Sequence, residues 1–113
     1  MDMEIQTMDE IKIPVIIARI DASNAKTVEK DLLELINSGT KKFICDFSKN
    51  EYISSAGLRV FLTILKNMQR SDGRIVLCSL TSYVQEVFDM AGFSQLFEIY
   101  KTKSEAIEKM QSL

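Results

Sequence analysis

The sequence predicts an α/β domain with a mixed, mostly parallel sheet of about five strands covered by about four helices. Three observations lead to this prediction. The chain has 113 residues, which is the usual size of a single domain. Short β-rich apolar runs alternate with segments of helical periodicity, in the order ββαβαβαβα. The connections between them are short, and short strand–helix–strand units form right-handed crossovers between parallel strands. We therefore expect residues 1–113 to form one domain.

The first twenty residues predict a β-hairpin. Apolar runs around Ile5 and from Ile11 to Ile20 are separated by the turn-like residues 7–10. Pro14 interrupts the second run, and proline inside a sheet is confined to edge strands and bulges. We therefore expect Pro14 to lie at an edge or at a bulge.

The next segments predict a helix and a buried strand. Apolar residues recur at helical spacing from about 24 to 38, with Ser23 or Asn24 as the capping residue and Gly39 just after the last turn. The run from Lys42 to Phe47 is short and β-rich and carries the apolar residues Phe43, Ile44, Cys45 and Phe47, which is consistent with a strand buried on both faces.

The second half of the chain continues the alternation. A helix is predicted from about 55 to 70, a strand from 74 to 79, and a helix that ends at Gly92. A short strand near 96–100 then leads into a capping box at 102–105 that opens the last helix. Two more glycines, Gly39 and Gly73, follow predicted helices, so all three are expected to adopt positive φ.

The composition excludes several classes of function. Fourteen Lys and Arg residues against sixteen Asp and Glu residues give a net charge of −2, which argues against a nucleic-acid partner. The chain has no histidine, which removes His-based zinc sites and Ser-His-Asp or Cys-His catalysis. Neither glycine-rich nucleotide-binding motif occurs. We therefore expect a non-enzymatic protein with no metal and no cofactor.

Other apolar features predict a cytoplasmic protein with a well-filled core. The longest uninterrupted apolar stretch, 13–18, is too short to cross a membrane or to form a signal-peptide core, so we expect no membrane association. The two cysteines lie inside apolar runs, which predicts buried, reduced thiols. Three methionines at inward helical positions are expected to fill the core: Met68, Met90 and Met110.

One segment is not explained by the fold alone, namely the start of the second helix. If Ser54 is the N-cap, Ile53 and Leu58 occupy the two positions of a hydrophobic staple. Ser55 then lies at the first helical position, where its hydroxyl points outward and the helix dipole favours an anion. Gly57 follows inside the first turn, where glycine is unfavourable, and with the small Ala56 it predicts a bare backbone surface that a partner approaches closely.

Three further residues are candidates for the same surface. Arg59 belongs to the outward stripe of this helix, which is either a solvated face or a basic rim for an acidic partner. Asp21 and Asn24 lie between a strand and a helix start. Asp21 is either a turn residue only or lies beside the serine loop at the same end of the sheet.

Two segments resemble the STAS family of anti-sigma-factor antagonists and related sulphate-transporter domains. Residues 46–58, DFSKNEYISSAGL, resemble the signature around the family's phosphorylatable serine, and residues 19–25, RIDASNA, resemble its strand-to-helix turn with a recurrent Asp. The resemblance spans essentially the whole chain. Many members carry Asp immediately before the phosphorylated serine, where this chain has Ser54, so a charge is lost and Ser54 becomes a second candidate acceptor.

The resemblance implies a phosphorylation switch at Ser55. The unphosphorylated form would bind an anti-sigma factor, a serine kinase with a histidine-kinase-like ATPase fold, and so release its sigma factor. The kinase would phosphorylate Ser55, and a serine phosphatase of the PPM type would reverse this. We expect a monomer or weak dimer with a partner-binding surface made of Asp21, Asn24, Ser54, Ser55, Ala56, Gly57 and Arg59. Two alternatives remain open: a module that binds an anion or nucleotide at the exposed amides of 55–57, and partner switching outside sigma-factor control.

Overall fold

A five-stranded mixed sheet forms the centre of the molecule. The computed structural model describes residues 3–112. The strand order is β1-β2-β4-β6-β7, in which β1 and β2 are antiparallel and the other neighbours are parallel. The strands are β1 (Ile5–Met8), β2 (Ile11–Pro14), β4 (Lys42–Asp46), β6 (Arg74–Cys78) and β7 (Glu98–Tyr100). This arrangement confirms the predicted fold class.

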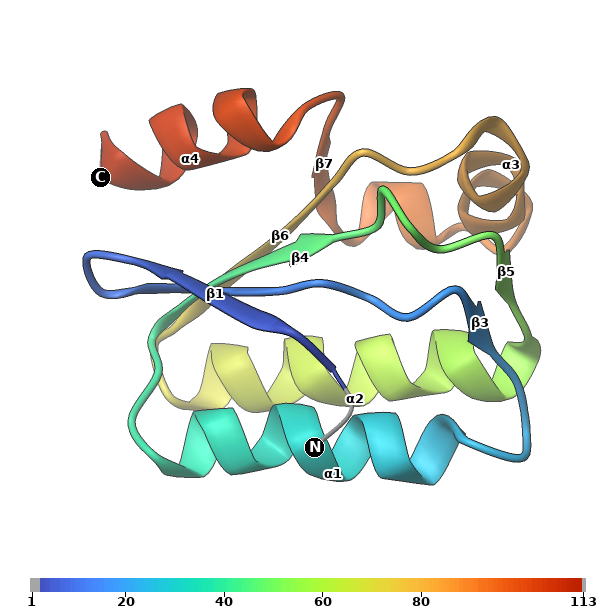
Figure 1. The fold of residues 1–113 in the computed structure, drawn as a ribbon, viewed down its shortest axis with the longest axis horizontal. Coiled ribbons are helices and arrows are strands. Elements are labelled where there is room, and N and C mark those ends of the chain that lie inside the picture. The colour runs from blue at the N-terminus through green and yellow to red at the C-terminus, as the bar shows by residue number, and fades with distance from the viewer. Residues whose placement is uncertain (1–2, 113) are drawn as a thin grey trace.

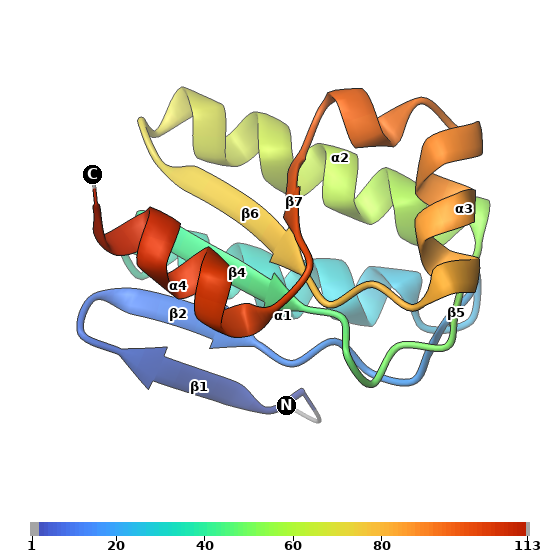
Figure 2. The ribbon, with the colours of Figure 1, turned by 90° about the horizontal axis from the view of Figure 1, so that it is seen from above.

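Helices cover both faces of this sheet. They are α1 (Ala25–Asn37), α2 (Ser55–Arg70), α3 (Ser82–Met90) and α4 (Lys103–Gln111), with a 3-10 turn, η1 (Phe93–Gln95), before β7. The paired helices α1 and α2 lie along one face and α4 along the other, while α3 lies at one end (Figure 1, Figure 2).

The layering follows from alternation along the central strands. Phe43 and Cys45 of β4 belong to the core cluster under α1 and α2, whereas Ile44 between them belongs to the smaller cluster under α4. Successive side chains of a strand point to opposite faces, so a strand covered on both sides must be apolar throughout. The buried strand predicted from Lys42 to Phe47 is confirmed.

Two further strands of two residues each form a separate parallel ladder, β3 (Arg19–Ile20) with β5 (Tyr52–Ile53). This ladder lies at the end of the molecule where both α1 and α2 begin (Figure 1). It brings the turn that follows Ile20 next to the turn that follows Ile53. Of the two alternatives left open for Asp21, the structure therefore supports the one that places it beside the serine loop.

The expectations for Pro14 and Gly73 were wrong. The edge strand is β1, β2 lies between β1 and β4, and the register of β2 with β4 is the same before and after Pro14, so Pro14 lies neither in an edge strand nor at a bulge. Pro14 is the last residue of β2, and the ladder to β4 is interrupted there because proline has no N–H to donate. After α2 the residue with positive φ is Asp72, at 59°, and not Gly73. A Cβ at Gly73 would lie 2.5 Å from Met68 Cε and 3.1 Å from the Lys41 carbonyl oxygen, so the glycine avoids two close contacts, of which the shorter is with the end of a flexible side chain.

Met90 is also not where the sequence predicted it. Met68 and Met110 are fully buried, as expected, but Met90 is 88% exposed. In α3 the inward positions belong to Val84 and Phe88, and a residue two positions after Phe88 lies about 200° around the helix from it. Met90 therefore lies on the outer face.

Both cysteines are free and buried, as predicted. Burial raises the pKa of the Cys45 thiol far above its ordinary value and that of Cys78 to about 11. Neither thiol is thus a ready nucleophile at neutral pH. Within residues 3–112, no helix has the length and apolar character needed to cross a lipid bilayer.

Candidate partner-binding surface

Ser54 is the N-cap of α2, as the sequence predicted. Its backbone is extended, and its Oγ accepts a hydrogen bond from the Gly57 amide at 3.3 Å. The Ser54 amide donates to the carbonyl oxygen of Ile20 at 2.9 Å, which ties the start of α2 to β3. Both residues of the predicted staple, Ile53 and Leu58, are buried in the same core cluster. The Ser54 hydroxyl therefore has a structural role, which is to accept a hydrogen bond from a free amide at the start of α2.

Ser55 is the first residue of α2, and it is exposed. No acidic residue lies in the first turn of the helix. The Gly57 amide is taken by Ser54 and the Leu58 amide by the Ser54 carbonyl. In the part of the chain that the structure describes, no acceptor is recorded for the amides of Ser55 and Ala56. An accessible hydroxyl thus lies at the positive end of a helix dipole.

Gly57 does not present a bare surface, contrary to the expectation from the sequence. It is buried, and a Cβ at this position would lie 2.7 Å from Ile53 Cγ1 and 2.8 Å from Ile20 Cγ2. The glycine therefore allows α2 to approach the β3–β5 ladder closely. Internal packing accounts for it, and its amide is not free to bind an anion.

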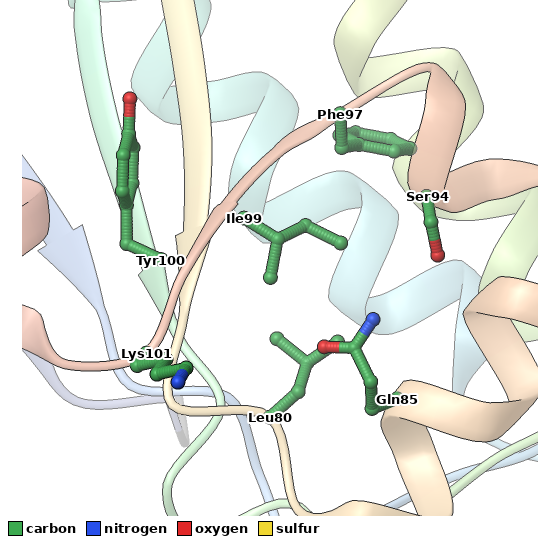
Figure 3. A pocket seen from close by; sticks show the side chains of 7 residues that line it. All are labelled: Leu80, Gln85, Ser94, Phe97, Ile99, Tyr100 and Lys101. Atoms are coloured by element: carbon green, nitrogen blue, oxygen red, sulfur yellow. The ribbon is translucent and has the colours of Figure 1, made fainter.

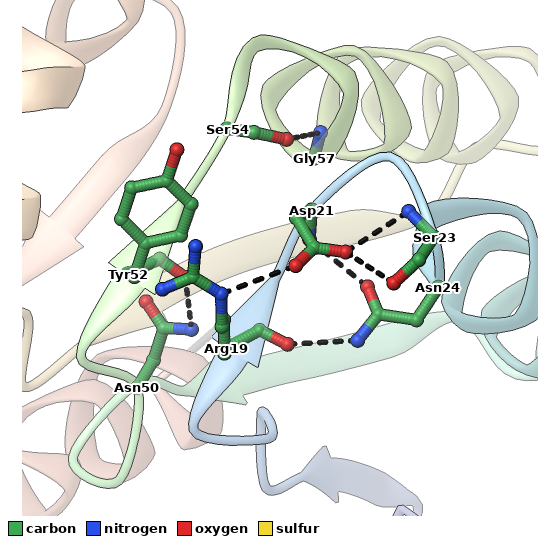
Figure 4. A network of polar contacts seen from close by, with 8 residues as sticks. All are labelled: Arg19, Asp21, Ser23, Asn24, Asn50, Tyr52, Ser54 and Gly57. Atoms are coloured by element: carbon green, nitrogen blue, oxygen red, sulfur yellow. Dashed lines mark hydrogen bonds and ion pairs between the residues drawn. The ribbon is translucent and has the colours of Figure 1, made fainter.

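Asp21 organises the turn between β3 and α1 (Figure 4). One carboxylate oxygen accepts hydrogen bonds from the Ser23 hydroxyl at 2.5 Å and the Ser23 amide at 2.9 Å, and the other pairs with Arg19 Nε at 3.1 Å. These hydrogen bonds, first those from Ser23 and then that from Arg19, lower the pKa of Asp21. The carboxylate is therefore charged and fixed in position at neutral pH.

Asn24 is the N-cap residue of α1, one of the two candidates that the sequence offered, but its side chain makes no capping hydrogen bond. The Asn24 Oδ1 accepts from the Asp21 amide at 3.0 Å, and its Nδ2 donates to the Arg19 carbonyl at 2.9 Å. These bonds close the turn back onto β3, which makes the Asp21 turn rigid.

An aromatic and cationic stack, which the sequence analysis missed, lies beside Ser54. The Arg19 guanidinium lies 4.1 Å from the centre of the Tyr52 ring (Figure 4). Tyr52 in turn stacks on Tyr83 of α3, with ring centres 6.4 Å apart. Arg19 pairs with Tyr52 in the β3–β5 register. The contact between Arg19 and Tyr52 could be predicted only from the pairing of β3 with β5, and strands of two residues leave too short a pattern to be recognised from sequence.

Arg59 and Ala56 line a shallow hollow of about 220 Å³ between α1 and α2. The other lining residues are Ala22, Ala25, Lys26, Glu29 and Val60. A second hollow, about 430 Å³, lies between α2 and α3 and includes Leu58, the half-exposed Tyr83 and the exposed Met90. The start of α2 contributes Ala56 to one hollow and Leu58, two residues later, to the other.

A third pocket, of about 560 Å³, lies between α3 and β7 and contains none of the predicted site residues (Figure 3). Lys101 is the one charged residue that lines it. Among residues 3–112, no group of three His, Cys, Asp or Glu side chains is placed to hold a metal ion. The structure brings together Asp21, Asn24, Ser54, Ser55, Ala56 and Arg59 at the start of α1 and α2, and leaves Gly57 inside.

Comparison with known proteins identifies the family. The model of the STAS domain matches residues 2–106. The chain belongs to the STAS domain family. BtrV of Bordetella bronchiseptica is 31% identical to this STAS domain over 106 residues, covering 94% of this chain and 91% of BtrV. The anti-sigma-B factor antagonist of Listeria monocytogenes is 30% identical, covering 91% of each chain.

Solved structures agree in fold. The crystal structure of TM1081 from Thermotoga maritima superposes with a TM-score of 0.90 at 27% identity, covering 96% of this chain and 94% of TM1081. The anti-sigma factor antagonist SpoIIAA in its unphosphorylated form gives 0.84 at 18% identity, covering 98% of this chain and 97% of SpoIIAA. The phosphorylated form of the Bacillus protein SpoIIAA gives 0.74 at 17% identity, covering 95% and 97%.

Proposed function

We propose that this STAS domain is a cytoplasmic, non-enzymatic anti-sigma factor antagonist that is switched by phosphorylation of Ser55. The unphosphorylated form binds an anti-sigma factor, which is itself a serine kinase, and releases the sigma factor held by that kinase. The kinase phosphorylates Ser55 and the complex dissociates. A PPM-type serine phosphatase restores the binding form.

The observation that carries the proposal is the division of roles between two adjacent serines. The Ser54 hydroxyl is engaged by the Gly57 amide, whereas the Ser55 hydroxyl is exposed at the first position of α2. A kinase therefore meets a free acceptor on a rigid helix end. The relatives support the same role, since the Listeria protein is named an anti-sigma-B factor antagonist and SpoIIAA, alike in fold, has a phosphorylated form.

Phosphorylation of this position changes the surface strongly. A phosphoserine carries about −1.5 to −2 charges at neutral pH. The neighbouring surface consists of the small Ala56 and two hollows lined largely by apolar side chains. A partner that covers this surface would have to desolvate the phosphate, and like charges across an interface cost several kcal/mol. Removal of the phosphate by a phosphatase needs no rearrangement of the core, because Ser55 lies outside the core.

Affinity for the kinase tests the proposal. The kinase is captured from extracts of the source organism on Ser55→Ala protein, purified, and titrated calorimetrically with wild type, Ser55→Ala and Ser55→Asp. Ser55→Ala is expected to bind like the unphosphorylated wild type, and Ser55→Asp to lose on the order of 100-fold in affinity.

Ser104→Asp provides the matched control. Ser104 is also an exposed serine in the first turn of a helix, but that helix, α4, covers the opposite face of the sheet. The Ser104→Asp variant carries the same added charge away from the proposed surface, and it is expected to bind the kinase with the affinity of the wild type. Equal affinities of Ser55→Asp and Ser55→Ala, or an equal loss in Ser104→Asp, would contradict the proposal.

A further inference from the structure

Arg59 is an exposed cation one turn after Ser55, and no carboxylate in the part of the chain that the structure describes forms an ion pair with it. The sequence of α2, SAGLRVFLTILKNMQR, contains no Asp or Glu, so no carboxylate on this helix can pair with it. The ion pairs that the structure records within residues 3–112 are Arg19–Asp21, Lys42–Glu10, Lys49–Glu4 and Arg74–Glu98, and Arg59 belongs to none of them. The Arg59 guanidinium is therefore available to an anion.

The spacing of the two residues suits an ion pair along the helix. Residues four apart are neighbours on a helix surface, with Cβ atoms about 5–6 Å apart. Side chains of a helix lean toward its N-terminus, so the Arg59 side chain is long enough and on the correct side of the helix to reach back toward Ser55. An anion that is N-terminal to a cation at this spacing is also the more favourable orientation.

We propose that Arg59 binds the phosphate of phosphorylated Ser55 within the same chain. This inference rests on the proposed phosphorylation of Ser55. The planar guanidinium donates two parallel hydrogen bonds to phosphate oxygens, a pairing that lysine cannot reproduce. Phosphorylation then acts twice on the partner surface: it adds a phosphate, and it withdraws Arg59 from any acidic group of the partner.

The other charged groups near Ser55 are less well placed. Arg19 is held by Asp21 and by the face of Tyr52. Lys26 lies on α1, and the hollow that it shares with Arg59 also contains the carboxylate of Glu29. The acids on the elements around the start of α2 are Asp21, Glu29 and Glu86, and all three are unchanged in every variant considered below. Arg59 is therefore the cation whose removal should matter most.

The test is a phosphorus NMR titration of protein that carries phosphoserine at position 55, installed during synthesis by a phosphoserine-specific suppressor tRNA. The probe is the phosphate itself. An i,i+4 ion pair lowers the second pKa of the phosphate by about 0.2–0.4 units at low ionic strength. Arg59→Gln is expected to raise that pKa by this amount, and added salt is expected to reduce the difference between the two proteins.

Two control variants give the test its specificity. Arg70→Gln removes an equally exposed arginine from the last turn of α2, and Lys26→Gln removes the cation on α1. Neither is expected to move the titration as far as Arg59→Gln. If Arg59→Gln titrates like the wild type, or if Lys26→Gln or Arg70→Gln shifts the pKa as much, the proposal is wrong.

A second readout checks the contact directly. The Nε–H signal of Arg59 is expected to shift and to exchange more slowly with water when Ser55 is phosphorylated, while that of Arg70 stays unchanged. Since the phosphate is installed without the kinase, both readouts are independent of the proposed function. If the kinase never modifies Ser55, the proposed function is wrong and the Arg59 result still stands. If Arg59 does not bind the phosphate, the proposed function still stands.

Discussion

Replacement of Gly57 by alanine tests whether the core or a partner requires this glycine. The added Cβ would lie 2.7 Å from Ile53 Cγ1, 2.8 Å from Ile20 Cγ2 and 3.3 Å from Ile20 Cβ. These atoms belong to β-branched side chains that are buried in the two-residue ladder, so they have little freedom to rotate away. We therefore expect α2 and the ladder to be forced apart.

Two opposing effects set the magnitude. Overpacking of a well-filled core costs about 1–3 kcal/mol, whereas alanine gains up to about 1 kcal/mol over glycine in a helix. The net expectation is a loss of about 1–2 kcal/mol in the free energy of unfolding. With an unfolding entropy of about 2.1 cal/mol/K per residue, this lowers Tm by about 4–8 °C for a chain of this length.

Urea and thermal unfolding followed by circular dichroism measure the loss. Gly73→Ala is the matched control: the contact of its Cβ under 3.0 Å is with Met68 Cε, the flexible end of a long side chain, and the Lys41 carbonyl oxygen lies at 3.1 Å, so it is expected to lose less. Folded Gly57→Ala protein should still bind the kinase. If Gly57→Ala keeps the stability of the wild type but no longer binds the kinase, the packing argument is wrong and Gly57 is required by the partner instead.

Three further predictions concern the cap, the thiols and the Asp21 turn. Ser54→Ala should lose about 1 kcal/mol of stability in urea unfolding, and Ser54→Asp should lose little, because Asp is an equally good N-cap. Cys45 and Cys78 should resist a thiol reagent at pH 8 in the native protein and react at once in denaturant, because burial raises both pKa values. The pKa of Asp21 is lower in the folded protein than in the unfolded chain, where it is near 3.8. The Asp21 carboxylate therefore stabilises the fold at pH values above 3.8, and this contribution is lost as the pH falls through the lower pKa of the folded state. Asp21→Asn should therefore flatten the acid limb of the stability profile, and carboxyl carbon NMR should place the Asp21 titration below 3.8.

Much of the fold could be predicted because local patterns and packing agree. The helix predicted from 55 to 70 is α2 to the residue, and its cap follows from Ser54 and the Ile53–Leu58 pair. Gly39 and Gly92 adopt positive φ, as residues after helices often do. Such features depend on neighbours within one helical turn, which a single sequence contains.

The features of the fold and of the site that could not be predicted depend on contacts between segments far apart in the sequence. Gly57 is explained by Ile20, which lies 37 positions earlier and meets it only through the β3–β5 ladder. The stack of Arg19 on Tyr52 likewise needs the register of two strands too short to be recognised. Met90 was misplaced because both faces of α3 carry apolar residues, so periodicity alone did not identify the buried one.

Peptide mass spectrometry of the protein isolated from its own cells tests whether Ser55 is the residue through which phosphorylation controls partner binding. We expect a phosphate on Ser55 in a fraction of the molecules that changes with growth conditions, and none on the capping residue Ser54. A chain that is unmodified at Ser55 under every condition, or one that carries its phosphate on Ser54, would contradict the proposed switch.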